Sequence, residues 1–263
     1  MSTIKIISRP NTYLSKRWEI GEGDVLNEFI LGKEIGFGNH SVVRIGYIRE
    51  SEVHKVAIKI FNVGEDENYE RELAFYSRTD ITHESLLKMI TACPPSSKIK
   101  YIVLPLCEKT LDQCEHPNTY LSAAINLAMY LHSKDLAIAS FRPANFLITT
   151  RNKLVMVDVG NISPMNNIKS HIPHFSTGNL LFGGSTTPWD ELVSLFYMFI
   201  ILDKPDALPW LTGFKLNVEL LQKYGRSPAS FLEDVPEEWH PLLSFFASTK
   251  KKLDNNNWMK LLP

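Results

Sequence analysis

The fold of this chain is decided by the stretch EIGFGNHSVV at residues 34–43 and by VAIK at residues 56–59. Gly36 and Gly38 are separated by one residue and lie between two strand-like segments. Glycine lets a backbone approach phosphate oxygens closely and present its N–H groups to them, although a lone G-x-G turn is more often an ordinary hairpin. VAIK alternates as a strand does, so its side chains point to two faces in turn. Lys59 can therefore lie beneath the glycine turn.

A helix is expected after these strands, over roughly Glu67 to Ser77, because Leu73 and Tyr76 are spaced three apart on one face. Glu72 lies on this helix, thirteen residues beyond Lys59, and is the natural partner of that lysine. A surface Lys and a surface Glu would be the ordinary interpretation of either residue alone. The glycine turn, VAIK and a helical Glu in this order form a much more specific pattern.

The periodicity changes near residue 110 from strand-like to mainly helical. Strands are expected at Phe29–Ile35, Ser41–Ile48, Val53–Phe61 and Tyr101–Leu106. Helical spacing then dominates, first over Tyr120–His132, and the most apolar run, Leu192–Leu202, reads as a buried helix. The pattern predicts an α+β protein with a small sheet-rich lobe followed by a larger helical lobe.

Composition excludes several classes of protein. The 263 residues are 44% hydrophobic and 22% charged, which are globular values and not those of a disordered, collagenous or coiled-coil chain. A formal net charge of −1 argues against a nucleic-acid partner. No apolar run reaches the ~20 residues of a membrane span, so we expect no membrane insertion. Three cysteines without ligand spacing and an N-terminus without a signal-peptide pattern favour an intracellular protein, cytoplasmic or nuclear.

Three further segments complete the pattern: YLHSKDL at residues 130–136, RPANFL at residues 142–147 and DVG at residues 158–160. Together with the glycine turn, Lys59 and Glu72, they resemble the eukaryotic protein-kinase fold. NFL within the second segment, DELVSLFY (190–197) and the later LPW most resemble the casein kinase I and vaccinia-related kinase group. The resemblance extends over nearly the whole chain, from about residue 29 to residue 262.

The resemblance implies an N-terminal extension at residues 1–28, a kinase-like N-lobe at 29–106 and a C-lobe at 107–263. It also implies binding of ATP and Mg²⁺, with roles for individual residues. In nucleotide binding it gives a role to Gly36, Gly38, Lys59, Glu72, Pro105, Cys107 and Arg142, and in metal coordination to Asn145 and Asp158. Pro105 would offer its carbonyl to adenine and Cys107 its N–H, so the proline costs no adenine hydrogen bond.

The sequence departs from the family where the catalytic loop begins. The family has H-R-D there, and this chain has Ile138, Ala139 and Ser140. The missing Asp would accept the proton of the substrate hydroxyl, and a serine has neither the charge nor the pKa to replace it. The usual Asp of the large-lobe central helix falls on Glu191, which predicts a relaxed network around that position. Most histidines lack ligand spacing, so we expect them at the surface or in loops.

The sequence therefore predicts a pseudokinase of the casein kinase I and vaccinia-related type. It would bind ATP and act through contacts with protein partners, such as an active kinase or a signalling protein. One alternative is a Ser/Thr kinase with residual activity, since general-base help is modest in phosphoryl transfer. The other is a scaffold that binds no nucleotide.

Overall fold

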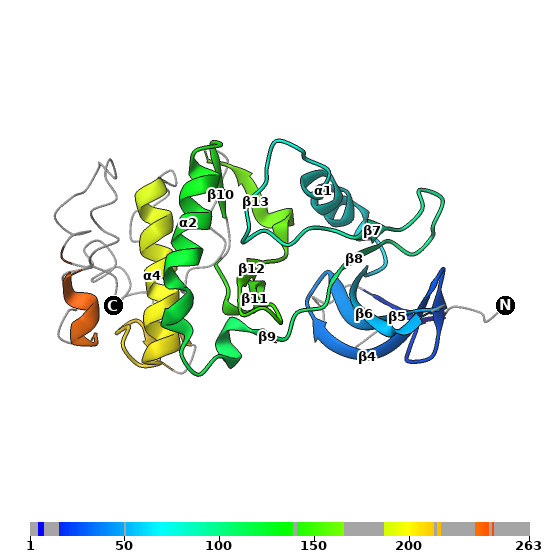
Figure 1. The fold of residues 1–263 in the computed structure, drawn as a ribbon, viewed down its shortest axis with the longest axis horizontal. Coiled ribbons are helices and arrows are strands. Elements are labelled where there is room, and N and C mark those ends of the chain that lie inside the picture. Colours follow the sequence, from blue (N-terminus) through cyan, green and yellow to red (C-terminus); the bar gives the residue numbers. More distant parts are fainter. Residues whose placement is uncertain are drawn as a thin grey trace. The chain divides into compact units, whose positions relative to one another are not determined.

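The computed structural model describes residues 5–7, 16–49, 51–138, 141–165, 187–212, 215–216, 235–241 and 244 (Figure 1). The chain divides into two compact units. Unit 1 contains Met1–Glu108 and Asp158–Gly160, and unit 2 contains Lys109–Val157 and Asn161–Pro263. Unit 1 is dominated by an antiparallel sheet and unit 2 by helices. This is the α+β class that the sequence predicts, and it is compatible with a two-lobe kinase-like fold.

A curled antiparallel sheet forms the body of unit 1 (Figure 1). Its strands follow the order β3-β4-β5-β6-β8-β7. The bounds are β3 Val25–Leu26, β4 Phe29–Phe37, β5 Ser41–Ile48, β6 Ser51–Phe61, β7 Thr91–Ala92 and β8 Tyr101–Pro105. A separate antiparallel pair precedes them, formed by β1 Lys5–Ile7 and β2 Arg17–Glu19. All four strands predicted in this region are confirmed.

The alternation of β6 separates the core of unit 1 from its polar face. Val56, Ile58 and Ile60 are buried in the core of the unit. The intervening Lys59 belongs to the opposite face, as the period of a strand requires. Burial of these three apolar residues therefore fixes the face of β6 on which the Lys59 side chain lies.

The helix of unit 1, α1, spans Asp66–Tyr76 and confirms the predicted element to within a residue at each end. Asp66 lies in its first turn, where a negative charge is favourable. The helix ends where the Ser77 hydroxyl donates to the Leu73 carbonyl at 2.8 Å. Glu72 is one of its buried residues, so the face carrying this carboxylate is turned away from solvent.

Unit 2 contains the helices α2 Leu121–His132 and α4 Pro188–Asp203, which contact each other (Figure 1). Its strands form three small sheets: β9, β11 and β12; β10 and β13; and β14 and β15. The strand bounds are β9 Lys109–Thr110, β10 Leu136–Ile138, β11 Phe146–Ile148, β12 Leu154–Met156, β13 Ile162–Pro164, β14 Leu211–Thr212 and β15 Lys215–Leu216. Short 3₁₀ helices are Leu111–Gln113, Pro117–Tyr120, Pro143–Asn145 and Glu237–Trp239, and a further one, Val159–Asn161, begins in unit 1 and ends in unit 2.

Helix α4 is the centre of unit 2 because its middle turns are buried all round. It begins at a capping box, in which the side chains of Thr187 and Asp190 each bond the backbone N–H of the other. Pro188 at the first helical position suits this start. The predicted buried helix at Leu192–Leu202 is confirmed. Within the described parts of the chain, no helix is both long and apolar enough to cross a bilayer.

Candidate functional site

The most distinctive polar cluster of unit 1 is centred on Lys59. Its ammonium group lies 2.5 Å from Glu72 Oε2 and 2.7 Å from Asp158 Oδ1. Lys59 is 9% exposed and Glu72 is 2% exposed, whereas the Asp158 side chain is 38% exposed. The structure therefore brings together three of the site residues that the sequence singles out, two of them buried and the third open to solvent.

The sheet and the helix position this cluster through ordinary local rules. Lys59 lies in the middle of the sheet, where it is paired with Val43 of β5 on one side and Ile102 of β8 on the other. The phenyl ring of Phe61, two residues along the same face, lies 5.3 Å from the Lys59 ammonium. Glu72 reaches the ammonium from α1. The lysine is thus fixed on a rigid strand and not on a loop.

The charges of the cluster influence one another strongly. Burial acts to lower the pKa of Lys59, but the attraction of Glu72 and Asp158 outweighs burial and the pKa is raised. Burial raises the pKa of Glu72; the nearby charge of Asp158 adds to this and Lys59 opposes it. With all three groups ionised, one positive charge faces two negative charges. The cluster therefore favours the approach of a further cation.

Asp158 is held in an unusual backbone conformation. Its φ is +60°, in the left-handed region that costs energy for a residue other than glycine. Two residues later, a Cβ added at Gly160 would lie 3.4 Å from Glu72 Cβ, in van der Waals contact with α1. A small residue at position 160 lets this segment lie against α1. The conformation directs the Asp158 carboxylate to Lys59.

Two polar atoms on α1 lie buried near the ion pairs without a hydrogen-bond partner among the described residues. They are Glu72 Oε1 and the hydroxyl oxygen of Tyr76, one helical turn apart. Burial raises the pKa of Tyr76 well above its usual value, and the charges of Glu72 and Asp158 add to the effect. The hydroxyl therefore stays protonated at neutral pH and keeps a donor for a water or a ligand.

The glycine turn joins β4 to β5. Gly36 pairs with Val43 across the hairpin, and the Gly38 N–H donates to the Ser41 carbonyl at 2.8 Å. Neither glycine has a positive φ. A Cβ at Gly36 would meet Val43 only at an ordinary distance of 3.7 Å, and a Cβ at Gly38 would meet nothing within 4 Å.

Two other glycines of the same sheet behave differently. A Cβ at Gly46 would lie 2.3 Å from Ile58 Cδ1, and one at Gly32 would lie 2.7 Å from the Tyr47 ring. Packing therefore requires glycine at positions 32 and 46. Packing does not require glycine at positions 36 and 38, where an added Cβ would meet no close neighbour.

Side chains also link the glycine turn to the start of α1. The His40 ring lies 2.8 Å from Glu65 Oε2, just before the helix. Asn62 donates to the Asn39 carbonyl at 3.0 Å through its side chain and to the His40 carbonyl at 2.8 Å through its backbone. No local pattern in the sequence predicts these contacts, because they join residues more than twenty positions apart.

Pro105, predicted to bind adenine together with Cys107, is the last residue of the core strand β8, and Cys107 lies two residues beyond it. Pro105 is paired with Val56 of β6, and the Cys107 thiol lies 4.0 Å from the Pro105 carbonyl oxygen. Burial raises the pKa of the Cys107 thiol, so the sulfur is not a reactive thiolate at neutral pH. The structure places both residues in unit 1 with the Lys59 cluster.

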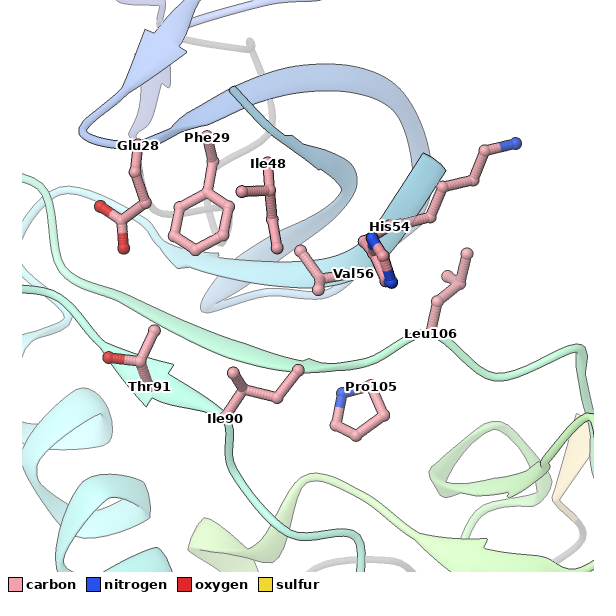
Figure 2. A pocket seen from close by; sticks show the side chains of 10 residues that line it. Glu28, Phe29, Ile48, His54, Val56, Ile90, Thr91, Pro105 and Leu106 are labelled. Atoms are coloured by element: carbon pink, nitrogen blue, oxygen red, sulfur yellow. The ribbon is translucent and has the colours of Figure 1, made fainter. Parts of the chain in front are cut away.

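A groove of about 530 Å³ in unit 1 is a separate feature (Figure 2). It is lined mostly by apolar side chains, among them Phe29, Val56, Ile90 and Pro105. Val56 and Lys59 are three residues apart on β6 and so belong to opposite faces of the strand. The groove is therefore not the site predicted around Lys59.

Arg142 and Asn145 belong to unit 2. Arg142 is exposed, and its carbonyl accepts from the Asn145 N–H at 2.9 Å. Asn145 is 8% exposed, and its side-chain nitrogen has no hydrogen-bond partner among the described residues. An unsatisfied buried amide nitrogen is a hydrogen-bond donor that a water or a ligand could satisfy. Ala139 and Ser140, at the degenerate catalytic-loop positions, lie outside the described residues.

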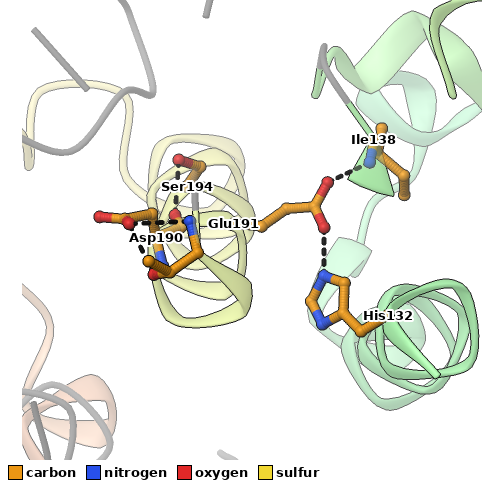
Figure 3. Close-up of polar contacts among 6 residues, drawn as sticks. His132, Ile138, Asp190, Glu191 and Ser194 are labelled. Carbon is orange, nitrogen blue, oxygen red and sulfur yellow. Dashed lines mark hydrogen bonds and ion pairs between the residues drawn. The ribbon is translucent and has the colours of Figure 1, made fainter. Parts of the chain in front are cut away.

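The prediction of a relaxed network around Glu191 is wrong. Glu191 is 2% exposed, and its carboxylate accepts from the Ile138 backbone N–H and bonds the His132 ring (Figure 3). Burial raises the pKa of Glu191, while the bonds to His132 and Ile138 oppose the shift. The longer Glu side chain reaches both partners from α4. Ile138, the first of the three degenerate catalytic-loop positions, is therefore bonded to α4 through Glu191.

The role of His132 was also missed. We expected most histidines at the surface or in loops, yet the His132 side chain is 9% exposed and closes the Glu191 network. Its position at the last residue of α2 was the available signal, because a polar residue at the end of an apolar helix can turn toward a neighbouring element.

Comparison with known proteins gives one informative similarity. No family model matches the chain. A protein of Encephalitozoon cuniculi (strain GB-M1), described as "Probable casein kinase I homolog", is 30% identical over 135 residues. The match covers 43% of this chain and 42% of that protein, so it spans less than half of the relative's length. Together with the α+β fold, this similarity suggests the protein kinase superfamily.

Proposed function

We propose that the protein is a pseudokinase of the casein kinase I and vaccinia-related type. It binds ATP together with a divalent metal ion, transfers phosphate negligibly, and acts through contacts with another protein. That partner is an active kinase or a signalling protein, and nucleotide occupancy sets the conformation around Lys59.

The observation that carries the proposal is the position of Lys59 between Glu72 and Asp158. A lysine buried in a sheet and oriented by two carboxylates is a costly arrangement for a purely structural role, because each buried charge must be desolvated. Its compact ammonium group suits phosphate oxygens. The 2.7 Å contact joins the Lys59 ammonium group to Asp158, the carboxylate of the cluster that is open to solvent.

The glycine turn gives independent support. Gly36 and Gly38 are not required by packing or by φ, unlike Gly32 and Gly46, which packing does require. A backbone without side chains is what close approach to phosphate groups needs. The two glycines and Lys59 are therefore all suited to bind phosphate groups.

The residues present also fit a magnesium ion held jointly with the nucleotide. Asp158 offers an exposed carboxylate, and oxygen atoms are the ligands that Mg²⁺ prefers. The role of Asn145 as a second ligand, through its amide oxygen, is what the resemblance to kinases implies. Among the described residues, no three His, Cys, Asp or Glu side chains gather as a metal site. Phosphate oxygens and water would complete the coordination. The bound ion would neutralise part of the phosphate charge.

Weak phosphoryl transfer is the second candidate function. Glu191 holds the backbone of Ile138, so the start of the catalytic-loop region is anchored even though Ser140 replaces the Asp. Positioning alone supplies much of the catalysis in phosphoryl transfer. Against it stands the missing base, worth ~10²–10⁴ in rate.

Thermal unfolding with ATP tests the binding part of the proposal. At about ten times the dissociation constant, Mg²⁺-ATP should stabilise the fold by about 1.4 kcal/mol. ATP with EDTA, and Mg²⁺ without ATP, separate the two contributions. An unchanged melting temperature, together with no signal from a fluorescent ATP analogue, would favour the scaffold that binds no nucleotide.

A further inference from the structure

The strand β2, which precedes the kinase-like sheet, contacts the glycine turn through Arg17. The Arg17 Nη1 lies 3.4 Å from each carboxylate oxygen of Glu34, two residues before Gly36. The guanidinium carbon lies 5.3 Å from the centre of the Phe37 ring. One side chain from β2 therefore holds both the entrance and the tip of the turn.

The neighbours of Arg17 are anchored to the sheet, so the arginine is itself held in place. The Val63 N–H donates to the Lys16 carbonyl at 2.8 Å. The Trp18 indole N–H donates to the Phe61 carbonyl at 3.0 Å. Phe61 is the last residue of β6, the strand that carries Lys59, and Val63 lies two residues beyond it. The segment 16–18 thus connects the end of this strand to the glycine turn.

The glycine turn needs such support. The pairing of β4 with β5 is irregular between Leu31 and Glu34 and again between Glu34 and Gly36. Two glycines add conformational freedom at the same place. Phe37 between them is 71% exposed and gains little from packing. The ladder is therefore irregular where the turn begins, and packing does not fix Phe37, whereas Asn62 and Glu65 contact residues 39 and 40 at the far end of the turn.

Glu34 is held from two sides. Arg44 Nη2 lies 3.6 Å from Glu34 Oε2, and Arg44 Nη1 donates to the Gly32 carbonyl at 3.1 Å. Arg44 belongs to β5 and stabilises the hairpin from within. Arg17 supplies the contact from outside the hairpin, and among these two arginines it is the one that also lies over the Phe37 ring.

We propose that Arg17 is a positioning residue for nucleotide binding, which clamps the glycine turn through Glu34 and Phe37 and so pre-organises it for phosphate. This inference rests on the proposed function. A pre-organised turn loses less conformational freedom when the ligand binds, so affinity rises without a new contact to the nucleotide. A cation over an exposed aromatic ring contributes an amount equal to about 2- to 5-fold in an equilibrium constant.

The test compares Arg17→Ala with a control variant, Arg78→Ala. The control removes a different arginine–carboxylate pair of unit 1, in which Arg78 lies 2.7 Å from Asp80. Arg17→Ala should raise the Kd of a fluorescent ATP analogue about 2- to 5-fold, mainly by faster dissociation, and Arg78→Ala should leave it unchanged. Arg17→Lys should recover part of the loss, because it keeps the charge over Phe37. In a Phe37→Leu background, Arg17→Ala should cost less than it does in wild type, because only the contact with Glu34 is then lost.

Hydrogen exchange of residues 36–41 without nucleotide provides a second measurement. Arg17→Ala should speed exchange in this turn, while Arg78→Ala should not. If wild type binds nucleotide and Arg17→Ala matches it in Kd and dissociation rate, the proposed positioning role is wrong. If wild type binds none, the proposed function fails, and exchange still tests the clamp: unchanged exchange would refute it and faster exchange would support it.

Discussion

The Asp158 carboxylate accepts a hydrogen bond of 2.7 Å from the Lys59 ammonium group. The backbone of Asp158 has a φ of +60°. This aspartate shares the lysine with Glu72, which lies 2.5 Å from the same ammonium group. A phosphate group that approaches Lys59 must therefore compete with two carboxylates. A cation at Asp158 would relieve that competition, and this coupling leads to the first prediction.

Asp158→Asn should weaken Mg²⁺-ATP binding about tenfold or more, because the variant loses the charge that would hold the metal ion. It should leave metal-free ATP binding unchanged or slightly tighter, since Lys59 then faces one carboxylate fewer. Titration of a fluorescent ATP analogue with Mg²⁺ and with EDTA measures both. Asp80→Asn, at an exposed ion pair with Arg78, is the matched control. Equal losses in both conditions would mean that Asp158 is structural.

Lys59→Met should destabilise the protein by about 3–5 kcal/mol, because Glu72 would remain buried without a cation. The double variant Lys59→Met with Glu72→Leu should recover most of this loss. The pKa of Glu72 is already raised in the folded protein, and loss of Lys59 raises it further. A carboxyl whose pKa is higher in the folded protein than in the unfolded chain stabilises the fold at pH values below its unfolded pKa. This stabilisation is lost as pH rises through its pKa in the folded protein.

The deficit of the single variant relative to wild type should therefore be smallest below pH 4.5, the ordinary pKa of a glutamate, and should grow toward neutral pH. Urea unfolding at several pH values checks this. A deficit that does not change with pH would show that Glu72 does not control the penalty.

Gly36→Ala and Gly38→Ala should each leave the free energy of unfolding within about 1 kcal/mol of wild type, since neither Cβ meets a close neighbour. Both should weaken ATP binding, because the added methyl group faces the expected phosphate position. Gly46→Ala is the control for packing: its Cβ would lie 2.3 Å from Ile58, so it should lose stability. If Gly36→Ala and Gly38→Ala both bind ATP with the affinity of wild type, the glycines do not support phosphate binding at this turn.

Glu191→Ala should destabilise the protein by about 3 kcal/mol, because the Ile138 N–H and the His132 ring lose a buried charged acceptor. Glu191→Gln keeps an acceptor and should lose less. The pKa of Glu191 is raised, so its protonated form favours the fold at low pH, and this contribution declines as pH rises from about 4.5. Denaturant unfolding of wild type and Glu191→Gln should show their difference in stability shrinking as pH rises. A difference independent of pH would contradict the assignment.

The sequence predicted those parts of the molecule that follow from local patterns. Alternation within VAIK predicts both the strand β6 and the face of Lys59, and helical spacing predicts α1 with Glu72 on it. The pairing of Lys59 with Glu72 followed from their order along the chain. These elements were accessible because each depends on neighbours a few residues away.

The parts that were missed depend on contacts between distant segments. Arg17 lies near Phe37 on a strand whose Trp18 bonds the last residue of β6, and no spacing in the sequence signals that contact. His132 and Glu191 lie 59 residues apart and meet through the packing of α2 and α4. A glutamate in place of the expected aspartate suggested a relaxed network, whereas its extra methylene group gives it the reach to bond both partners.

The central claim, ATP binding without transfer, is tested most directly by a single-turnover experiment with ATP radiolabelled at the γ-phosphate, in excess protein with Mg²⁺ and a generic protein acceptor. We predict that wild type retains labelled ATP on a filter while no label above background reaches the protein or the acceptor. Arg78→Ala should behave like wild type. Label transferred by wild type and abolished in Lys59→Ala would contradict the account and identify an active kinase.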